Sequence, residues 1–224
     1  MIDPTILALI AVAAAVLVAV ILVSRAAERK RTEAMRETAS MLGLSFAGES
    51  KKPVEAGLDV TLTAFTLFRH GGAPRVRNLM RASVTDGEDI VFEYRYTVST
   101  GKSSHTVEQT VAAFRRRAAR VPAFRMAPEN VFSRIGHALG GQDIDVDSNV
   151  EFSQHYALKG EDADAVRAFF QRQAASYFAE RPGWSVEGAG EWLILYRHGK
   201  RETPEDLREW LDDTRRAARA LDPR

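Results

Sequence analysis

Apolar and polar positions divide the chain into two parts with different patterns. From Pro4 to Val23 every residue except Pro4 and Thr5 is Ile, Leu, Ala or Val. These 20 positions would form a helix of ~30 Å, which is the thickness of the hydrocarbon core of a bilayer. Beyond Leu44 the apolar residues form short alternating runs instead. The pattern therefore predicts a transmembrane helix over 4–23 followed by a folded body.

The segment after the apolar run predicts a basic juxtamembrane helix or linker over 24–43. Strong helix formers continue to Leu42 without Pro or Gly, and Gly43 is a typical residue just beyond a helix end. Asp3 is the only charged side chain before the run, whereas five bases follow it closely: Arg25, Arg29, Lys30, Arg31 and Arg36. The positive-inside rule then places the amino terminus outside and the body in the cytoplasm, with a single span in the inner membrane.

Two other interpretations of the run fit less well. A cleavable signal peptide would begin with bases and have a shorter apolar stretch. A helix buried in a protein core can be apolar all round, but it rarely has so sharp a basic border. The flanking bases either set the topology on a solvated stalk or contact anionic lipid headgroups.

The first half of the body is predicted to be an antiparallel meander. In 90–98 the residues Ile90, Phe92, Tyr94, Tyr96 and Val98 share one face, which indicates a half-buried strand with Glu93 on its solvent face. The Asp86-Gly87 pair predicts a hairpin turn before this strand, and a polar turn joins it to a return strand. The runs at 63–68 and 121–126 would add further strands.

The second half is predicted to mix helices and strands. Helices are expected from Pro128 to Gly140-Gly141, from Asp162 to Pro182-Gly183, and from a cap at Thr203 onward. Strands are expected at 151–160 and in a hairpin over 184–199. The body, 44–224, is therefore predicted to be α+β, a mostly antiparallel sheet with about three packed helices. It could divide into lobes 44–141 and 142–224.

Composition narrows the chemistry without naming a reaction. Lys plus Arg is 31 against 30 for Asp plus Glu, so no chain-wide field attracts nucleic acid, and no nucleic-acid partner is expected. The chain contains no cysteine, which excludes disulfides, thiolate catalysis and thiolate metal ligands. No cofactor or metal is expected.

Three short motifs were weighed as sites. Gly101-Lys102-Ser103 matches the end of a P-loop, but Tyr96 stands where its first Gly is needed. The acids Asp143, Asp145, Asp147 and Glu151 are close in sequence, but they lack the EF-hand pattern and suit a solvated strand better. The five histidines, His70, His105, His137, His155 and His198, show no metal-binding or catalytic spacing.

The densest basic cluster of the body is a candidate interaction patch. It consists of Arg115, Arg116, Arg117 and Arg120, with Phe114 and Phe124 at its borders. Nucleic-acid binding would need more interleaved aromatic residues. The patch is interpreted as a solvated face or as a docking surface for the inner leaflet or an acidic partner.

Several blocks resemble a group of uncharacterised bacterial membrane proteins with one amino-terminal span. The resemblance covers most of 60–210 and is carried by YRYT at 94–97, QTVAAF at 109–114 and PAFRMAPE at 122–129. These residues are mainly aromatic, apolar or turn-forming. The resemblance implies a shared topology and transfers no catalytic residue, because the group has no assigned activity.

Three hypotheses for function remain open. The leading one is a non-enzymatic, membrane-anchored interaction or scaffold module at the inner leaflet, whose partners are the bilayer, anionic headgroups or a membrane-associated protein. The second is a module that binds lipid or a small ligand in a pocket between the meander and the carboxy-terminal helices. The third is an enzyme whose site is assembled from Glu93, His105, Asp145 and His155.

Overall fold

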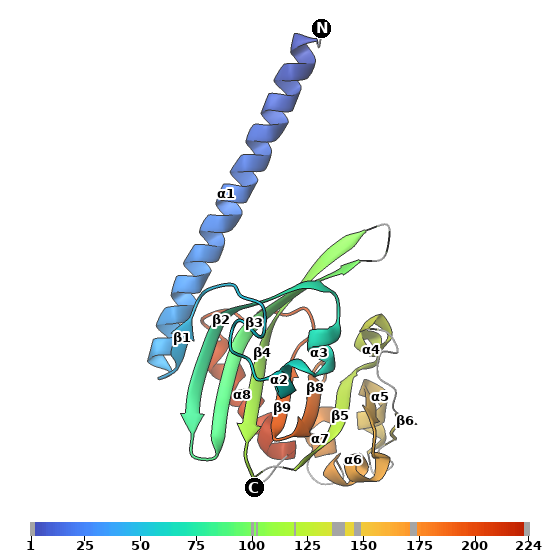
Figure 1. Ribbon diagram of the computed structural model, residues 1–224. Coiled ribbons are helices and arrows are strands. Elements are labelled where there is room, and N and C mark those ends of the chain that lie inside the picture. The colour runs from blue at the N-terminus through green and yellow to red at the C-terminus, as the bar shows by residue number, and fades with distance from the viewer. Residues whose placement is uncertain are drawn as a thin grey trace.

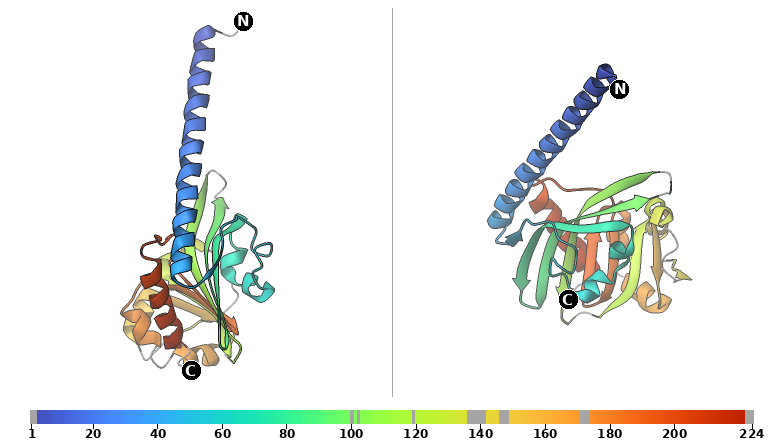
Figure 2. Two further views of the ribbon diagram at one scale, coloured as in Figure 1. Left: turned by 90° about the vertical axis from the view of Figure 1, so that its left-hand side faces the viewer. Right: turned by 45° about the horizontal axis from the view of Figure 1, so that its top comes forward.

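The amino-terminal helix leaves the body as a long arm. The computed structural model describes residues 3–99, 101, 103–118, 120–135, 142–145, 149–170 and 174–221, with the backbone alone for 133–135 and 142–143. α1 (Pro4–Met41) is one helix of 38 residues that joins the predicted span to the predicted basic segment without a break. Figures 1 and 2 show its first half clear of the other elements and its last turns beside β1 and β2.

The apolar half of α1 has the features of a single-pass membrane anchor. Among the described helices, α1 alone is long and apolar enough to cross a membrane. None of its apolar window is buried in the body, and Leu9 and Val23 are each 70% exposed. So large an apolar surface requires an apolar surrounding, which a bilayer provides.

The end of α1 is determined locally, as the sequence predicts. Gly43 follows the C-cap residue Leu42 and has a φ of 70°, which glycine adopts without strain. Its N–H donates to the carbonyl of Ser40 at 3.1 Å, and the N–H of Leu44 donates to the carbonyl of Ala39 at 2.9 Å. This pair of bonds is a Schellman motif, and the burial of Leu44 fixes the direction in which the chain enters the body.

One antiparallel sheet of nine strands forms the centre of the body, in the order β1-β2-β3-β4-β9-β8-β5-β7-β6. The α+β prediction is therefore confirmed, and residues from both suggested lobes contribute strands to the same sheet. The strands are β1 (Ser45–Ala47), β2 (Gly72–Val84), β3 (Gly87–Ser99), β4 (Ser104–Arg116), β5 (Val121–Pro128), β6 (Gln142–Asp143), β7 (Tyr156–Gly160), β8 (Ser185–Gly190) and β9 (Trp192–Tyr196).

Helices cover both faces of the sheet. They are α2 (Val60–Thr63), α3 (Thr66–Arg69), α4 (Glu129–Ile135), α5 (Val150–His155), α6 (Ala163–Phe170), α7 (Ala174–Ala179) and α8 (Leu207–Leu221). Figure 2 (left) shows α8, in dark red, on one side of the sheet and the teal segment with α2 and α3 on the other. The first core includes Phe170, Trp184 and Trp210, and the second includes Leu62, Phe92 and Tyr94.

The meander is shorter than predicted. β2, β3 and β4 pair in sequence, but the free edge of β4 pairs with β9 (Val111 with Tyr196) and not with β5. β5 pairs with β8 and β7 instead. Residues 63–68, predicted to be a strand, belong to α2 and α3, because Asp59 caps α2 through the N–H of Thr61 at 2.7 Å and helical turns follow.

The helices are shorter and more numerous than predicted. The strand expected at 151–160 begins only at Tyr156, because Asn149 caps α5 through the N–H of Phe152 at 2.9 Å. The single helix expected from Asp162 is described as α6 and α7. The first predicted helix begins at Glu129, so Asn130 lies inside it, and its predicted end at Gly140-Gly141 lies outside the described residues. The last helix is predicted to start from a cap at Thr203, but α8 begins only at Leu207; the hydroxyl of Thr203 accepts from the N–H of Asp206 at 3.2 Å in the turn that precedes it.

Candidate functional site

Six charged side chains form a cluster where the second half of α1 meets the sheet. We call this cluster the α1 junction: Glu28, Arg31, Arg77, Glu93, Glu108 and Arg201. They come from α1, β2, β3, β4 and the segment before α8. Three arginines and three glutamates therefore balance one another where residues far apart in sequence meet.

Glu93 is the centre of the α1 junction. It lies on β3 and is 4% exposed, which corrects the prediction that its face of the strand meets solvent. Its Oε1 accepts from Nε of Arg31 at 2.7 Å, and its Oε2 accepts from Nη2 of Arg201 at 3.0 Å. Asn78, which lies at a bulge in β2 with a φ of 48°, donates to Oε2 at 2.8 Å. The carboxylate is thus buried but fully hydrogen-bonded, as a buried charge requires.

The remaining ion pairs extend the α1 junction to its partly exposed rim. Arg201 Nη1 lies 2.9 Å from Glu28 and 2.7 Å from Glu108, and Arg77 lies 2.6 Å from Glu28. The hydrogen bond from Arg201 holds the pKa of Glu28 below its ordinary value, against the smaller effect of burial. Burial alone would lower the pKa of Arg201, but Glu28 and Glu93 raise it above its ordinary value. Glu28 and Arg201 are therefore charged at neutral pH.

Apolar contacts and two hydrogen bonds to backbone carbonyls also attach α1 to the body. Met35 and Ala39 on α1 are completely buried in the first core. Arg31 also donates to the carbonyl of Glu202, and the hydroxyl of Thr38 donates to the carbonyl of Pro204 at 3.3 Å. Because α1 is continuous from Pro4, these contacts hold the anchor and the body in one orientation.

The five bases predicted to flank the membrane have different surroundings. Arg31 belongs to the α1 junction and is directed into the body, so it is not free for lipid. Arg36 lies 5.2 Å from the ring of Phe46 and 3.5 Å from Glu33. Arg25, Arg29 and Lys30 are exposed, and they form no ion pair within the described part of the chain. Contact with anionic headgroups stays a prediction for these three.

A second candidate site is a pocket at the end of the body remote from the amino terminus of α1 (Figure 1). It has a volume of about 580 Å³ and lies between α8, the turn joining β2 to β3, and the adjoining ends of β4 and β9. We call it the Asp89 pocket. Its apolar wall includes Phe114, Val121 and Leu193, and its charged residues include Arg116, Arg215 and Arg219. Its volume lies within the range of small-molecule sites.

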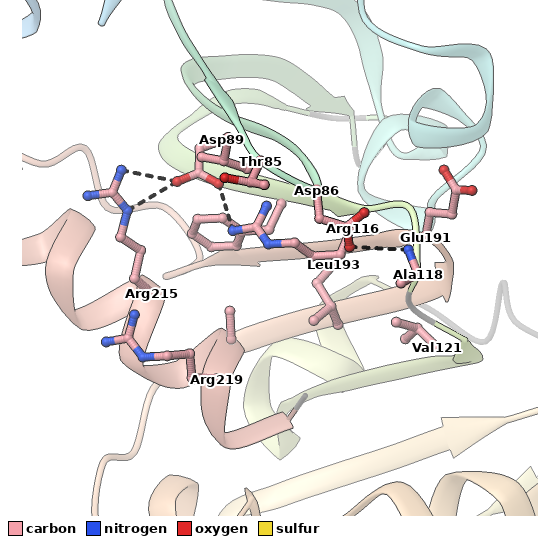
Figure 3. Close-up of a pocket in the computed structure, with 13 residues that line it drawn as sticks. Thr85, Asp86, Asp89, Arg116, Ala118, Val121, Glu191, Leu193, Arg215 and Arg219 are labelled. Carbon is pink, nitrogen blue, oxygen red and sulfur yellow. Dashed lines mark hydrogen bonds and ion pairs between the residues drawn. The ribbon is translucent and has the colours of Figure 1, made fainter. Parts of the chain in front are cut away.

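Two arginines clamp the buried carboxylate of this pocket, as Figure 3 shows. Asp89 is 4% exposed; its Oδ1 accepts from Arg116 at 2.8 Å, and its Oδ2 accepts from Nε and Nη2 of Arg215 at 3.1 and 3.0 Å. Arg219 also lines the pocket, one turn further along α8, and forms no ion pair among the described residues. Asp86 and Glu191 line the pocket as well, so it combines an apolar wall with three arginines and three carboxylates.

The predicted interaction patch divides at this pocket. Arg115 pairs with Glu191 at 2.9 Å and Arg116 pairs with Asp89, so both are used within the body. Arg117 and Arg120 are exposed. All four arginines lie at the end of β4 or just after it, on the side of the body away from the amino-terminal end of α1 (Figure 1). This position does not suit direct contact with a membrane that holds the amino-terminal half of α1.

The clamp gives a direct prediction. The substitution Asp89→Asn should lower the free energy of unfolding by about 2 kcal/mol, because three charge-assisted hydrogen bonds from two arginines lose their anion. Urea denaturation of the detergent-solubilised protein, followed by tryptophan fluorescence, measures it. The control Asp212→Asn removes the same charge from an exposed residue 3.7 Å from Arg215 and should change stability by less than about 0.5 kcal/mol. Equal effects of the two substitutions would contradict the clamp.

The four residues of the enzyme hypothesis are not brought together. His105 lies on β4 five residues from Thr110, the cross-strand partner of Glu93, a separation of roughly 17 Å. Asp145 and His155 are exposed near β7, five strands away from β3 and so roughly 24 Å across the sheet. Within the described residues these groups form no shared site.

The other sequence motifs also fail to form sites. Gly101 and Ser103 lie in the β3–β4 hairpin, so no helix follows them as a P-loop requires; Lys102 lies outside the described residues. Asp147, His137 and the side chain of Asp143 lie outside the described part as well. Among the described side chains, no group of three or more acids or histidines could hold a metal ion.

Sequence reasoning missed most of the α1 junction and the Asp89 clamp. Arg77, Arg201 and Asp89 occur in ordinary mixed-charge contexts, and their partners are distant in sequence. The sequence did contain one signal: charged residues occur within the strands β2 and β3, whose pattern indicates burial. A buried acid or base without an oppositely charged neighbour in the sequence indicates a partner that is distant in the sequence.

The structure defines this protein as an α+β protein whose long apolar amino-terminal helix is consistent with a single-pass membrane anchor. No protein-family model matches the chain, and no curated protein matches it significantly. Among solved structures, the mycobacterial trehalose monomycolate transport factor A, TtfA, is similar with a TM-score of 0.57 and 12% sequence identity. The match covers 87% of this chain and 96% of the TtfA chain. At this identity the similarity shows a shared fold alone.

Proposed function

We propose that this chain is a single-pass inner-membrane protein whose cytoplasmic body is a non-enzymatic interaction module for an integral membrane protein. The observation that carries this proposal is the α1 junction. A flexible tether would be enough to concentrate a domain at a membrane. The buried ion pairs instead fix the rotational orientation of the body relative to the span, because both are joined to one continuous helix. Only a partner that contacts both the span and the body can depend on this fixed orientation.

Features of the span and its flank support the same function. Ala11, Ala15 and Ala19 repeat every four residues, a spacing that allows close approach of another transmembrane helix. The exposed bases Arg25, Arg29 and Lys30 support a cytoplasmic body through the positive-inside rule. Because the chain has no native cysteine, single cysteines can test this orientation. A cysteine at Ser40 should react with an impermeant maleimide only after the cells are opened.

Insertions of alanine between Val23 and Ser24 test the function. Two alanines rotate the body by about 200° relative to the span, and four rotate it by only about 40° although they add more length. We expect capture of the partner from native membranes to fall at least about tenfold with two alanines and to recover largely with four. The measurement is affinity capture of the full-length protein with quantitative mass spectrometry.

The controls separate orientation from tethering. A flexible Gly-Ser insertion at the same place keeps the anchor and the body but should behave like the two-alanine variant. Equal capture by all variants would reduce α1 to a simple tether. Absence of any enriched membrane protein with the wild-type chain would contradict the interaction function itself.

The Asp89 pocket favours a second candidate function, the binding of a ligand with an apolar part and an acidic group. Arg219, which forms no ion pair among the described residues, supplies a cation for the acidic group, and Phe114, Val121 and Leu193 supply the apolar wall. The trehalose monomycolate transport named for the structural neighbour is compatible with a lipid ligand. Binding of an anionic lipid that Arg219→Gln abolishes would favour this function over protein interaction alone.

A further inference from the structure

A second pocket opens on the sheet face opposite α8. It has a volume of about 240 Å³ and lies between the α2–α3 segment and strands β5, β7 and β8. Phe65, Ala123 and Ala189 give it apolar walls, and Arg125 and Glu187 from neighbouring strands lie in it. We call it the Arg125 pocket. It is smaller than a typical drug-sized site of ~300 Å³ or more, so it suits a small ligand.

Arg125 is the unusual residue of this pocket. It is 2% exposed, yet its Nε and Nη2 make no hydrogen bond. The ring of Phe132 lies 4.5 Å from its Cζ and covers one face of the guanidinium. Within the described part of the chain, no carboxylate forms an ion pair with it. A buried guanidinium with unused donors is energetically unfavourable unless an anion or another acceptor reaches it.

Glu187 does not neutralise Arg125, although the two residues are direct cross-strand partners. Its Oε2 accepts from the N–H of Thr66 at 2.6 Å, and its Oε1 accepts from the N–H of Leu67 at 3.0 Å. Both oxygens are thus used to hold α3. Burial raises the pKa of Glu187, and Arg125 and these hydrogen bonds only oppose that rise.

The other charged groups around the pocket are mostly cationic. Arg69 at the end of α3 and Lys159, the cross-strand neighbour of Arg125 on β7, line it together with one exposed acid, Glu161. Burial and the charge of Arg125 lower the pKa of His70 to about 4, so this nearby imidazole is neutral and adds no charge. Three cationic side chains, including Arg125, thus line the pocket beside two acidic ones, Glu161 and Glu187.

We propose that the Arg125 pocket binds a small oxyanion ligand, a carboxylate or phosphate monoester with a short apolar group. The acid oxygens pair with the guanidinium of Arg125, whose planar fork matches such groups in a bidentate manner. Because Nε and Nη2 are buried, this pairing requires the guanidinium to turn toward the pocket. The apolar group lies against Phe65, Ala123 and Ala189. This site is separate from the α1 junction and from the Asp89 pocket, and it does not depend on the proposed membrane partner.

Calorimetric titration of the full-length protein in non-ionic detergent tests the site. The probes are hexyl phosphate, hexanoate and the neutral hexanol at constant ionic strength. We expect both anions to bind and hexanol to bind at least roughly tenfold more weakly. Competition by solubilised phosphatidic acid would assign the oxyanion to a lipid headgroup, and its absence would assign it to a soluble metabolite. Equal binding of hexanol, or no binding of either anion at millimolar concentration, would overturn the proposal.

Variants separate binding from folding. Arg125→Met keeps the apolar stem and should abolish anion binding; its urea unfolding transition checks that the variant folds, since Glu187 loses the cation beside it. Arg125→Lys keeps the charge without the fork and should weaken binding at least roughly tenfold, which gives a second test if the methionine variant does not fold. Arg181→Met, which removes a guanidinium 4.4 Å from Tyr177 elsewhere, should leave binding unchanged. Unchanged affinity in Arg125→Met would overturn the proposal.

Discussion

The substitution Glu93→Ala should lower the free energy of unfolding of the body by about 3–5 kcal/mol, the usual effect of removing one partner from a buried ion pair. The loss is large because the guanidinium groups of Arg31 and Arg201, each less than one-fifth exposed, then face each other without the shared carboxylate. Asn78 also loses its acceptor. Urea denaturation of the full-length protein in detergent measures the change.

The matched control, Glu33→Ala, also removes one glutamate charge, but at an exposed position on α1. Glu33 is 63% exposed and pairs only weakly with Arg36 at 3.5 Å, so Glu33→Ala should cost less than about 0.5 kcal/mol. Glu93→Gln keeps one acceptor and should lie between the two. If Glu93→Ala were no more destabilising than Glu33→Ala, the α1 junction would not hold the anchor against the body.

The geometry of the α1 junction explains why such a cluster would be used. A buried ion cluster adds little net stability compared with well-packed apolar residues, because desolvation offsets most of the attraction. It does require one arrangement of its parts, since each carboxylate must meet specific donors. A cluster that joins α1, β2, β3 and β4 in one arrangement suits a protein whose span and body act together.

The second large effect is expected at Glu187. Replacement by alanine should destabilise the protein by about 3 kcal/mol, because the buried N–H groups of Thr66 and Leu67 lose their acceptors. Arg125 also loses the buried carboxylate of its cross-strand partner. Denaturant unfolding gives the total, and faster hydrogen exchange at the amides of Thr66 and Leu67 shows that the loss occurs at α3.

Glu191 offers the control for this prediction. It lies in the same hairpin, is 35% exposed and pairs with Arg115 at 2.9 Å, so Glu191→Ala should cost less than about 1 kcal/mol. Glu187→Gln retains one acceptor oxygen and should recover part of the stability. Unchanged amide exchange at residues 66 and 67 in Glu187→Ala would show that the carboxylate does not hold α3.

Features that depend on neighbouring residues alone could be predicted from the sequence. The span follows from 20 successive apolar or small residues, the helix end from Gly43, and the turn that leads into α8 from Thr203. The β3–β4 hairpin follows from alternation on both sides of a polar turn. In each case a few adjacent residues already contain the required hydrophobic length, φ preference or hydrogen-bond acceptor.

The tertiary structure alone decided what depends on distant residues. Residues 63–68 are predicted to form a strand, but α3 forms there with its first N–H groups held by Glu187, which is about 120 positions away. β9, not β5, pairs with β4, and this choice cannot be read from either strand. Glu93 and Arg125 are buried because strands and helices from elsewhere cover them. The physical reason is that burial and ion pairing are properties of the assembled sheet, whereas hydrophobic length and capping are properties of the local chain.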